Sequence, residues 1–347
     1  MRFLNPVLVL LTTAGVIFAS QAETEVAGEA KKYPAGLIAL SDEPQFASHS
    51  FVVDKSKRTL FVYEWKGNDL NIIAEYPADI GKKMGDKTKE NDHRTPVGIY
   101  FLQKEMTQPE IPFETYGNLA FTTDYPNIFD KRDQKTGSGI WLHAVPDTVP
   151  LTRGSRGCVV VRNDVIKLLK SFVRLEQTPI LIFDEVKFLS KDDYQAQKNK
   201  FLQDFENWRT AWEKQDVDTY IKYYDQTFKN DQMNYNQWYR HKKKLKQLYS
   251  YIKVNLTPPI ILQNKDQIVI RTIQRYESNM HKDYGEKTIH ARLSPEVGFQ
   301  IIREDWKPMM DPVAATNPGA AAEKSSLEAK LPASVPNPEP EAAKTNN

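Results

Sequence analysis

Short runs of apolar and β-branched residues, separated by turn residues, fill the chain from residue 50 to residue 184. Two of these runs flank a Lys-Ser-Lys-Arg turn at residues 55–58, which predicts a β-hairpin. One stretch, residues 164–173, has the apolar spacing of a helix. We therefore expect a mostly β domain with short strands and long loops. The predicted strands are residues 50–55, 59–65, 70–76, 98–102, 119–122, 140–143, 158–161 and 180–183.

From residue 191 the spacing of apolar residues changes to that of helices. Residues 214–218 divide the pattern into two helices, and a third helix is expected at residues 235–249. Helices followed by a run of strands predict a second, α+β domain over residues 191–308, after a linker. The predicted strands of this domain are residues 251–256, 267–277, 287–293 and 299–305.

The helices of the second domain carry a stripe of aromatic residues and one basic stretch. An aromatic stripe with charges between its members is typical of a helix core and not of a cofactor site. The basic stretch at residues 240–246 is expected to be a solvated helix face. The stripe consists of Tyr194, Phe201, Phe205, Trp208, Trp212, Tyr220, Tyr223, Tyr224 and Phe228.

The two ends of the chain differ in composition from the predicted domains. A basic start, an apolar run over residues 6–19 and small residues before Glu23 are typical of a secretory signal peptide at residues 1–22. The apolar run is shorter than the roughly 20 residues that span a bilayer, which favours cleavage over a stable membrane anchor. Residues 23–49 are expected to be a lead-in to the first domain. Residues 309–347, rich in Ala, Pro and Glu, are expected to be disordered.

The composition narrows the classes of chemistry that the chain can perform. A net charge of +2 over 347 residues gives no basis for binding nucleic acid. The six histidines show no paired ligand spacing, so we expect neither a metal site nor another cofactor. Export makes the single cysteine, Cys158, informative, because no disulfide can form within the chain. It is either an inert buried residue or a reactive thiol.

The residues around Cys158 favour the reactive thiol. A nucleophilic cysteine needs a base, donors for the developing oxyanion and access for the substrate. His143 ends one apolar strand and Cys158 opens the next, so adjacent strand ends would place imidazole and thiol side by side. Gly157 permits close backbone approach, and amides near the cysteine could form an oxyanion hole. Arg156 supplies positive potential, which lowers the pKa of a thiol and attracts a carboxylate.

Four segments in a fixed order surround this predicted dyad. They are Lys-Met-Gly-Asp-Lys at residues 83–87, Arg-Thr-Pro-Val-Gly-Ile-Tyr at 94–100, Gly-Ser-Gly-Ile-Trp-Leu-His at 137–143 and Ser-Arg-Gly-Cys at 155–158. Together they resemble the L,D-transpeptidase (YkuD-type) catalytic domain, over roughly residues 50–184. The resemblance implies a β-sandwich with a short helix. Two positions depart from the family pattern: Arg156 stands where the family often has histidine, and Ala144 where it usually has glycine.

The resemblance implies a peptidoglycan stem tetrapeptide as substrate, cut after its diaminopimelate residue. His143 would take the thiol proton, Cys158 would attack the carbonyl, and D-alanine would leave a thioester on the enzyme. Ser155 or a nearby backbone carbonyl would orient His143, and Gly157 belongs to the same catalytic turn. For Trp141 and Tyr125 packing is the ordinary role, and for Arg156 the alternative to substrate binding is a solvated surface position. The candidate substrate-binding residues are Arg156, Ala144, Trp141, Tyr125 and Arg94.

The second domain resembles an NTF2-like domain, whose cone would be either a pocket for glycan or peptide or a scaffold without a ligand. A YkuD-type domain joined to such a module resembles the cell-shape-determining L,D-carboxypeptidases of curved and helical bacteria. We therefore expect hydrolysis to tripeptide and D-alanine in the periplasm. The alternative is attack by an amine, which would form 3–3 cross-links or attach or release a wall-linked protein. A non-catalytic peptidoglycan-binding module is the alternative of another class.

Overall fold

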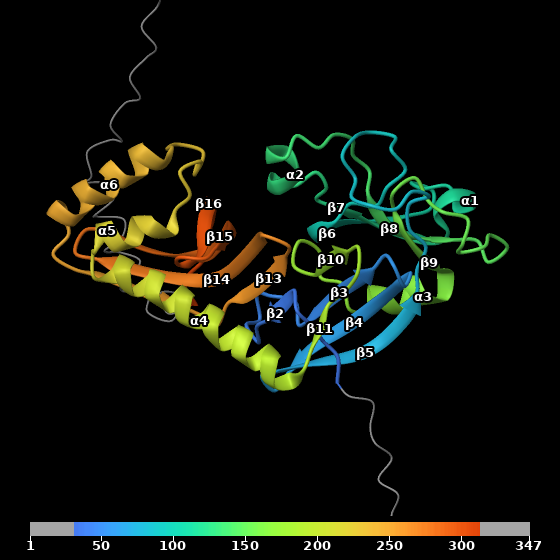
Figure 1. The fold of residues 1–347 in the computed structure, drawn as a ribbon, viewed down its shortest axis with the longest axis horizontal. Coiled ribbons are helices and arrows are strands. Elements are labelled where there is room, and N and C mark those ends of the chain that lie inside the picture. The colour runs from blue at the N-terminus through green and yellow to red at the C-terminus, as the bar shows by residue number, and fades with distance from the viewer. Residues whose placement is uncertain (1–30, 313–347) are drawn as a thin grey trace, which may run out of the picture. The chain divides into compact units, whose positions relative to one another are not determined.

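The computed structural model describes residues 31–312 (Figure 1). The predicted signal peptide lies outside the described residues, as does the predicted disordered tail from residue 313 onward. The expected fold class is confirmed, because a mostly β region is followed by an α+β region. Within residues 31–312 no helix is both long enough and apolar enough to cross a membrane.

The mostly β region is built on one mixed sheet of eight strands. The strands are β3 (His49–Asp54), β4 (Thr59–Lys66), β5 (Asp69–Pro77), β6 (Gly98–Thr107), β7 (Leu119–Thr123), β8 (Trp141–Val145), β9 (Val159–Arg162) and β10 (Pro179–Phe183). Their order is β5-β4-β3-β10-β6-β7-β8-β9, and the predicted hairpin is the antiparallel pair β3 and β4. Two pairs are parallel, β10 with β3 and β8 with β9.

The parallel pair β8 and β9 brings the two predicted catalytic residues to one place in the sheet. His143 lies opposite Val160, and Cys158 directly precedes β9. Helix α3 (Asn163–Lys170) follows β9 and buries Ile166 and Leu169 against the same core. Two further helices, α1 (Phe113–Tyr116) and α2 (Ile128–Arg132), were not predicted. Each has at most five residues, which is too short for a periodic pattern.

The α+β region has three helices and a six-stranded sheet. Helices α4 (Lys191–Glu213) and α5 (Val217–Tyr220) divide where the sequence predicts, and α6 (Tyr235–Leu248) is the expected third helix. The aromatic stripe from Phe201 onward forms the core between helices and sheet, with Trp208 fully buried, whereas Tyr194 lies in a separate apolar cluster. The strands are β2 (Leu37–Ala39), β12 (Ile252–Leu256), β13 (Ile260–Asn264), β14 (Gln267–Ser278), β15 (Lys282–Ser294) and β16 (Gly298–Pro308).

The predicted lead-in contributes two strands that join the regions. β1 (Tyr33–Pro34) pairs with β11 (Phe188–Leu189), and β2 pairs with β13 of the second sheet. The side-chain amide of Asn264, in β13, donates hydrogen bonds to the carbonyl oxygens of Gly98 at 3.2 Å and Ile182 at 2.8 Å. One apolar cluster contains residues of both sheets. The segment before the catalytic sheet therefore completes the sheet of the second region.

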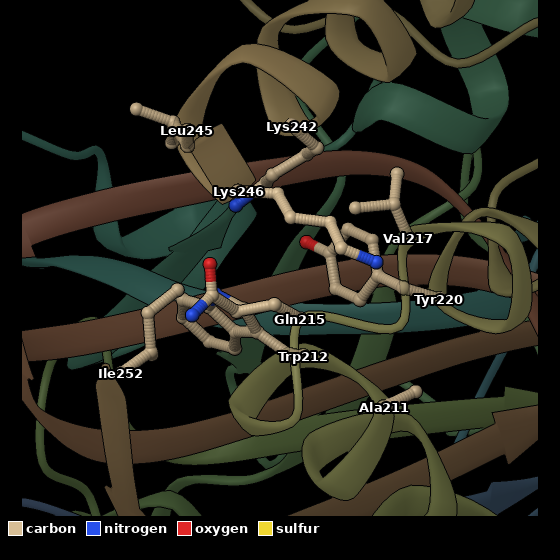
Figure 2. A pocket seen from close by; sticks show the side chains of 9 residues that line it. All are labelled: Ala211, Trp212, Gln215, Val217, Tyr220, Lys242, Leu245, Lys246 and Ile252. Carbon is tan, nitrogen blue, oxygen red and sulfur yellow. The ribbon is translucent and has the colours of Figure 1, made fainter. Parts of the chain in front are cut away.

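Helix α6 carries one lysine whose ammonium group is enclosed by aromatic rings. The Nζ atom of Lys242 lies 4.3 Å from the ring centre of Trp238, 4.9 Å from Trp212 and 5.1 Å from Tyr220. Figure 2 shows Lys242 among the residues that line a cavity, together with Trp212 and Tyr220. Burial lowers the pKa of Lys242 to about 7, although the charge of Glu304 opposes the shift. The expectation of a fully solvated basic face is therefore wrong for this residue.

Replacing Lys242 with methionine is expected to stabilise the fold by at least about 1 kcal/mol near neutral pH. The pKa of Lys242 is about 7 in the folded state and 10.5 as the ordinary value. The unfolded chain therefore binds more protons between these values, and the wild-type free energy of unfolding rises with pH across that window. Methionine does not titrate, so the advantage of the variant shrinks as pH rises. Urea unfolding at both ends of the window measures the difference in free energy of unfolding between the variant and the wild type.

Lys244→Met, on the exposed side of α6, is the control. An equal pH dependence of the two variants would contradict the low pKa of Lys242.

Candidate active site

Cys158 follows a tight turn that presents its side chain at the start of β9. The hydroxyl of Ser155 donates to the Cys158 carbonyl oxygen at 2.7 Å and accepts from the Gly157 amide at 3.0 Å. Gly157 has φ of 138°, and a Cβ at this position would lie 2.8 Å from the carbonyl oxygen of Arg94. Only glycine fits such a conformation and approach. The Ser-Arg-Gly-Cys segment is therefore fixed by its own hydrogen bonds.

Cys158 is partly exposed as a residue, and its thiol contacts the segment that leads into β8, the strand that carries the histidine. Its Sγ atom lies 3.5 Å from the carbonyl oxygen of Gly139, and it accepts a hydrogen bond from the backbone amide of Trp141. Desolvation raises the pKa of Cys158 to about 11, while the Trp141 amide and the charge of Lys87 act in the opposite direction. Positive charge thus lowers this pKa as expected, but the charge belongs to Lys87 and not to Arg156, and burial outweighs it.

His143 is buried and is held by the residue that follows it. Its Nδ1 atom lies 2.6 Å from the carbonyl oxygen of Ala144. A carbonyl only accepts, so Nδ1 carries the proton and Nε2 is left as the basic nitrogen. Of the two groups expected to orient His143, the backbone carbonyl is the one that contacts it, whereas the Ser155 hydroxyl is engaged in the turn. Desolvation lowers the pKa of His143 to about 4, against the effect of the Ala144 carbonyl.

The resting dyad therefore consists of two neutral groups. Burial disfavours the charged form of each residue, and it raises the pKa of Cys158 while it lowers the pKa of His143. A neutral imidazole can accept the thiol proton during attack, which is general-base catalysis and not a preformed ion pair. The geometry can support nucleophilic acyl transfer, with proton transfer coupled to the attack.

The candidate substrate-binding residues do not all reach the cleft. Arg156 is exposed and makes no ion pair with any residue of the described range. Trp141 is half-buried, and its ring packs against Tyr116 at 4.7 Å. Tyr125 is buried, and its hydroxyl donates to the carbonyl oxygen of Thr136 at 3.1 Å. Packing is therefore the role that the contacts of Tyr125 support.

The remaining two candidates lie below the surface of the site. The methyl group of Ala144 is fully buried, so this residue offers the site its backbone only. The guanidinium of Arg94 is partly buried, and its Nη1 atom lies 3.5 Å from the carbonyl oxygen of Asp86. Its backbone carbonyl is the group that lies close to Gly157. Arg94 therefore lies against the catalytic turn through its backbone, whereas Ala144 contacts His143 through its carbonyl oxygen.

Two buried charged residues, missed in the sequence, support the loops around the thiol. Lys55 donates to the carbonyl oxygens of Gly85 at 2.6 Å and Thr95 at 3.0 Å, inside the family segments. The carboxylate of Asp79 accepts from the Gly154 amide at 2.7 Å, just before the catalytic turn. Nothing in the local sequence distinguishes either residue from a solvated charge. Their roles follow from contacts between segments far apart in the chain.

Tyr116 is the other residue that sequence reasoning missed. Its ring lies 4.7 Å from the ring of Trp141 and 5.0 Å from the ring of His143. It belongs to α1, which packs against β8 (Figure 1). No motif or period marks a tyrosine in a four-residue helix, so the sequence alone could not have found it.

Alkylation of Cys158 by iodoacetamide is expected to be slow at neutral pH and to accelerate up to about pH 10 and beyond. The thiolate is the nucleophile, and burial raises the pKa of Cys158 to about 11. Mass spectrometry of the intact protein measures the rate without ambiguity, because the chain has one cysteine. Free glutathione is the reference thiol, and Cys158→Ala gives the background. A rate that reaches its plateau below about pH 7 would show a thiolate–imidazolium pair instead.

Both regions of the chain match known protein families. Residues 48–182 match the L,D-transpeptidase catalytic domain family, YkuD. Residues 200–305 match the Cds6 C-terminal NTF2-like domain. The first match contains all four catalytic segments, and the second contains the aromatic core of the α+β region.

Solved structures extend the likeness across both regions. Bd1075 of Bdellovibrio bacteriovorus is 53% identical, with 81% of this chain and 99% of that chain covered, at a TM-score of 0.76. The helical cell shape determining protein Pgp2 of Campylobacter jejuni is 25% identical, covering 80% of this chain and 94% of that chain, at a TM-score of 0.62.

YafK of Escherichia coli, whose name assigns it provisionally to the L,D-transpeptidases, is 24% identical over 173 residues. That alignment covers 50% of this chain, and the chain spans 60% of the length of this relative. The family matches and the 53% identical structure cover both regions of the fold. The chain therefore belongs to the YkuD-type L,D-transpeptidase family and carries a C-terminal NTF2-like domain.

Proposed function

We propose that the protein is an L,D-carboxypeptidase that removes D-alanine from stem tetrapeptides of peptidoglycan, at the bond after diaminopimelate. The observation that carries the proposal is the pairing of β9, which the partly exposed Cys158 directly precedes, with the strand that carries a buried His143, whose Nδ1 is engaged by the Ala144 carbonyl so that Nε2 is left as the base. The family acts on peptidoglycan stem peptides, which places its members in the cell envelope. For this chain the periplasm is the compartment that fits both the family and the predicted signal peptide.

The reaction proceeds in two steps on the same pair of residues. Nε2 of His143 takes the thiol proton while Sγ of Cys158 bonds to the carbonyl carbon of the scissile amide. The C–N bond then breaks, the proton passes to the leaving amine of D-alanine, and a thioester remains. Water attacks the thioester with His143 again as base, the C–S bond breaks, and the thiol regains its proton. Tripeptide and enzyme are released.

The catalytic turn offers one backbone donor for the oxyanion. The Gly157 amide is occupied by the Ser155 hydroxyl, at 3.0 Å. The Cys158 amide makes no hydrogen bond with any residue in the described part of the chain. An amide of this kind next to the nucleophile can donate to the oxygen that becomes negative during attack. We therefore assign the Cys158 N–H as an oxyanion donor.

The charge around the thiol suits a peptide that carries several carboxylates. Lys82, Arg153 and Arg156 are exposed and, among residues 31–312, form no ion pair. They lie on adjoining segments, because the Lys82 amide donates to the carbonyl oxygen of Ser155 at 3.1 Å. A cleft lined by one sign of charge concentrates ligands of the opposite sign. Stem peptides with free carboxylates are negatively charged and are therefore attracted by these three cationic side chains.

The architecture of the whole chain favours water over an amine as the second substrate. The likeness to Pgp2, named as a helical cell shape determining protein, covers 80% of this chain and therefore both regions. Trimming of tetrapeptides removes acyl donors for cross-linking, which gives a hydrolase of this kind a direct means of changing local wall stiffness. The same thioester could instead pass to an amine and give a 3–3 cross-link. The products distinguish the two fates.

Incubation of the mature protein with purified disaccharide-tetrapeptide is expected to yield disaccharide-tripeptide and free D-alanine. Cys158→Ala should abolish the product, and His143→Ala should reduce the rate by at least about 100-fold because the general base is lost. Mass spectrometry identifies the products, and an Arg240→Gln variant, changed on the exposed part of α6, serves as the matched control. Cross-linked dimers that form with the wild type but with neither active-site variant would show that the activity is transpeptidation and not hydrolysis. Product from Cys158→Ala would overturn the mechanism.

A further inference from the structure

Tyr116 places an unpartnered hydroxyl group at the edge of the catalytic dyad. Its ring packs edge-on against His143 at 5.0 Å, and the side chain is half-buried. Burial raises the pKa of this phenol, the negative charge of a Cys158 thiolate would raise it further, and the charge of Arg156 lowers it. It makes no hydrogen bond with any residue in the described range. The hydroxyl of Tyr116 therefore has no acceptor among residues 31–312 and is available to a ligand.

The position of Tyr116 is fixed by the turn that follows it. Gly117 has φ of 63°, and a Cβ at this position would lie 2.5 Å from Oδ1 of Asn163 and 2.7 Å from Cβ of Ala144. The Asn163 side chain accepts from the Asn118 amide at 2.8 Å and donates to the carbonyl oxygen of Val145 at 2.9 Å. The end of α1 is thereby tied to the end of β8. Tyr116 and His143 are held by one set of contacts.

Arg156 supplies the second donor on the same side of the thiol. It lies two residues before Cys158 in a turn fixed by Ser155, and its exposed guanidinium has no acidic partner among the described residues. The acidic residue of α1, Glu114, is exposed and forms no ion pair within residues 31–312. A carboxylate has two oxygen atoms and can accept from a guanidinium and from a hydroxyl at the same time.

We propose that the Tyr116 hydroxyl and the Arg156 guanidinium together bind the free C-terminal carboxylate of the residue that leaves. This inference rests on the proposed function and specifies its substrate: the chain end must lie one residue beyond the scissile bond. A stem that continues further, or whose terminal carboxyl group is in an amide bond with a neighbouring stem, cannot make this contact. The pair therefore restricts the enzyme to free tetrapeptide ends and spares cross-linked stems.

The test measures binding and turnover separately, on the full mature chain. In the Cys158→Ala background, calorimetry compares a tetrapeptide ending in D-alanine with the same peptide ending in D-alaninamide. The acid is expected to bind at least about tenfold more tightly than the amide, because hydrogen bonds to a charged acceptor are lost in the amide. Adding Tyr116→Phe or Arg156→Gln should each reduce that preference severalfold, whereas Glu114→Gln on the exposed face of α1 should leave it intact.

Measurements of turnover then distinguish the role of the Tyr116 hydroxyl from the role of its ring. Tyr116→Phe should raise KM for the acid with little change in kcat, because the packing on His143 is kept. Tyr116→Leu should also lower kcat and move the pH profile, because the ring contact with His143 is lost. Equal binding of acid and amide, or no binding of either, would overturn the inference. A preference for the acid that depends on Tyr116 would uphold it even if the wild type cleaved neither peptide, an outcome that would reject the proposed function alone.

Discussion

The parallel pairing of β8 with β9 is the constraint on which the active site depends. It sets the strand that carries His143 beside the strand that Cys158 opens, and no other contact between the two catalytic segments is as extensive. Parallel strands need a crossover of a dozen or more residues, so the connection between them is long enough to form the catalytic turn. Asp79 and Ser155 hold that connection in place, and Arg156 lies within it. The positions of the candidate nucleophile, of the candidate base and of Arg156 thus follow from one strand pairing.

Desolvation then sets the chemistry of the pair. It favours the neutral form of both residues, since it raises the pKa of Cys158 and lowers the pKa of His143. A neutral thiol is a poor target for oxidation, which would suit the single cysteine of a chain for which a signal peptide is predicted. The positive charge nearby is consequently not required to hold a thiolate in the resting enzyme. Arg156 remains available for a carboxylate of the substrate.

The sequence predicted what depends on local pattern and missed what depends on distant contacts. The hairpin, the strands around His143 and Cys158 and the helical core of the second region are all readable from apolar spacing. Strand β13 was missed because two prolines precede its short apolar run. The group that orients His143 and the direction of the Cys158 pKa shift could not be derived, because both depend on which backbone surrounds the residues after folding. Tyr116 was missed for the same reason.

Ala144 shows how a departure from the family pattern can be accommodated. Its methyl group occupies the space that a Cβ at residue 117 would need, since the two atoms would lie 2.7 Å apart. The methyl is therefore compatible with glycine at 117 and with no larger residue there. The consequence reaches the site, because Gly117 ends the helix that carries Tyr116, while the Ala144 carbonyl orients His143. One small residue thus contacts both the glycine that ends α1 and, through its carbonyl oxygen, the imidazole of the candidate base.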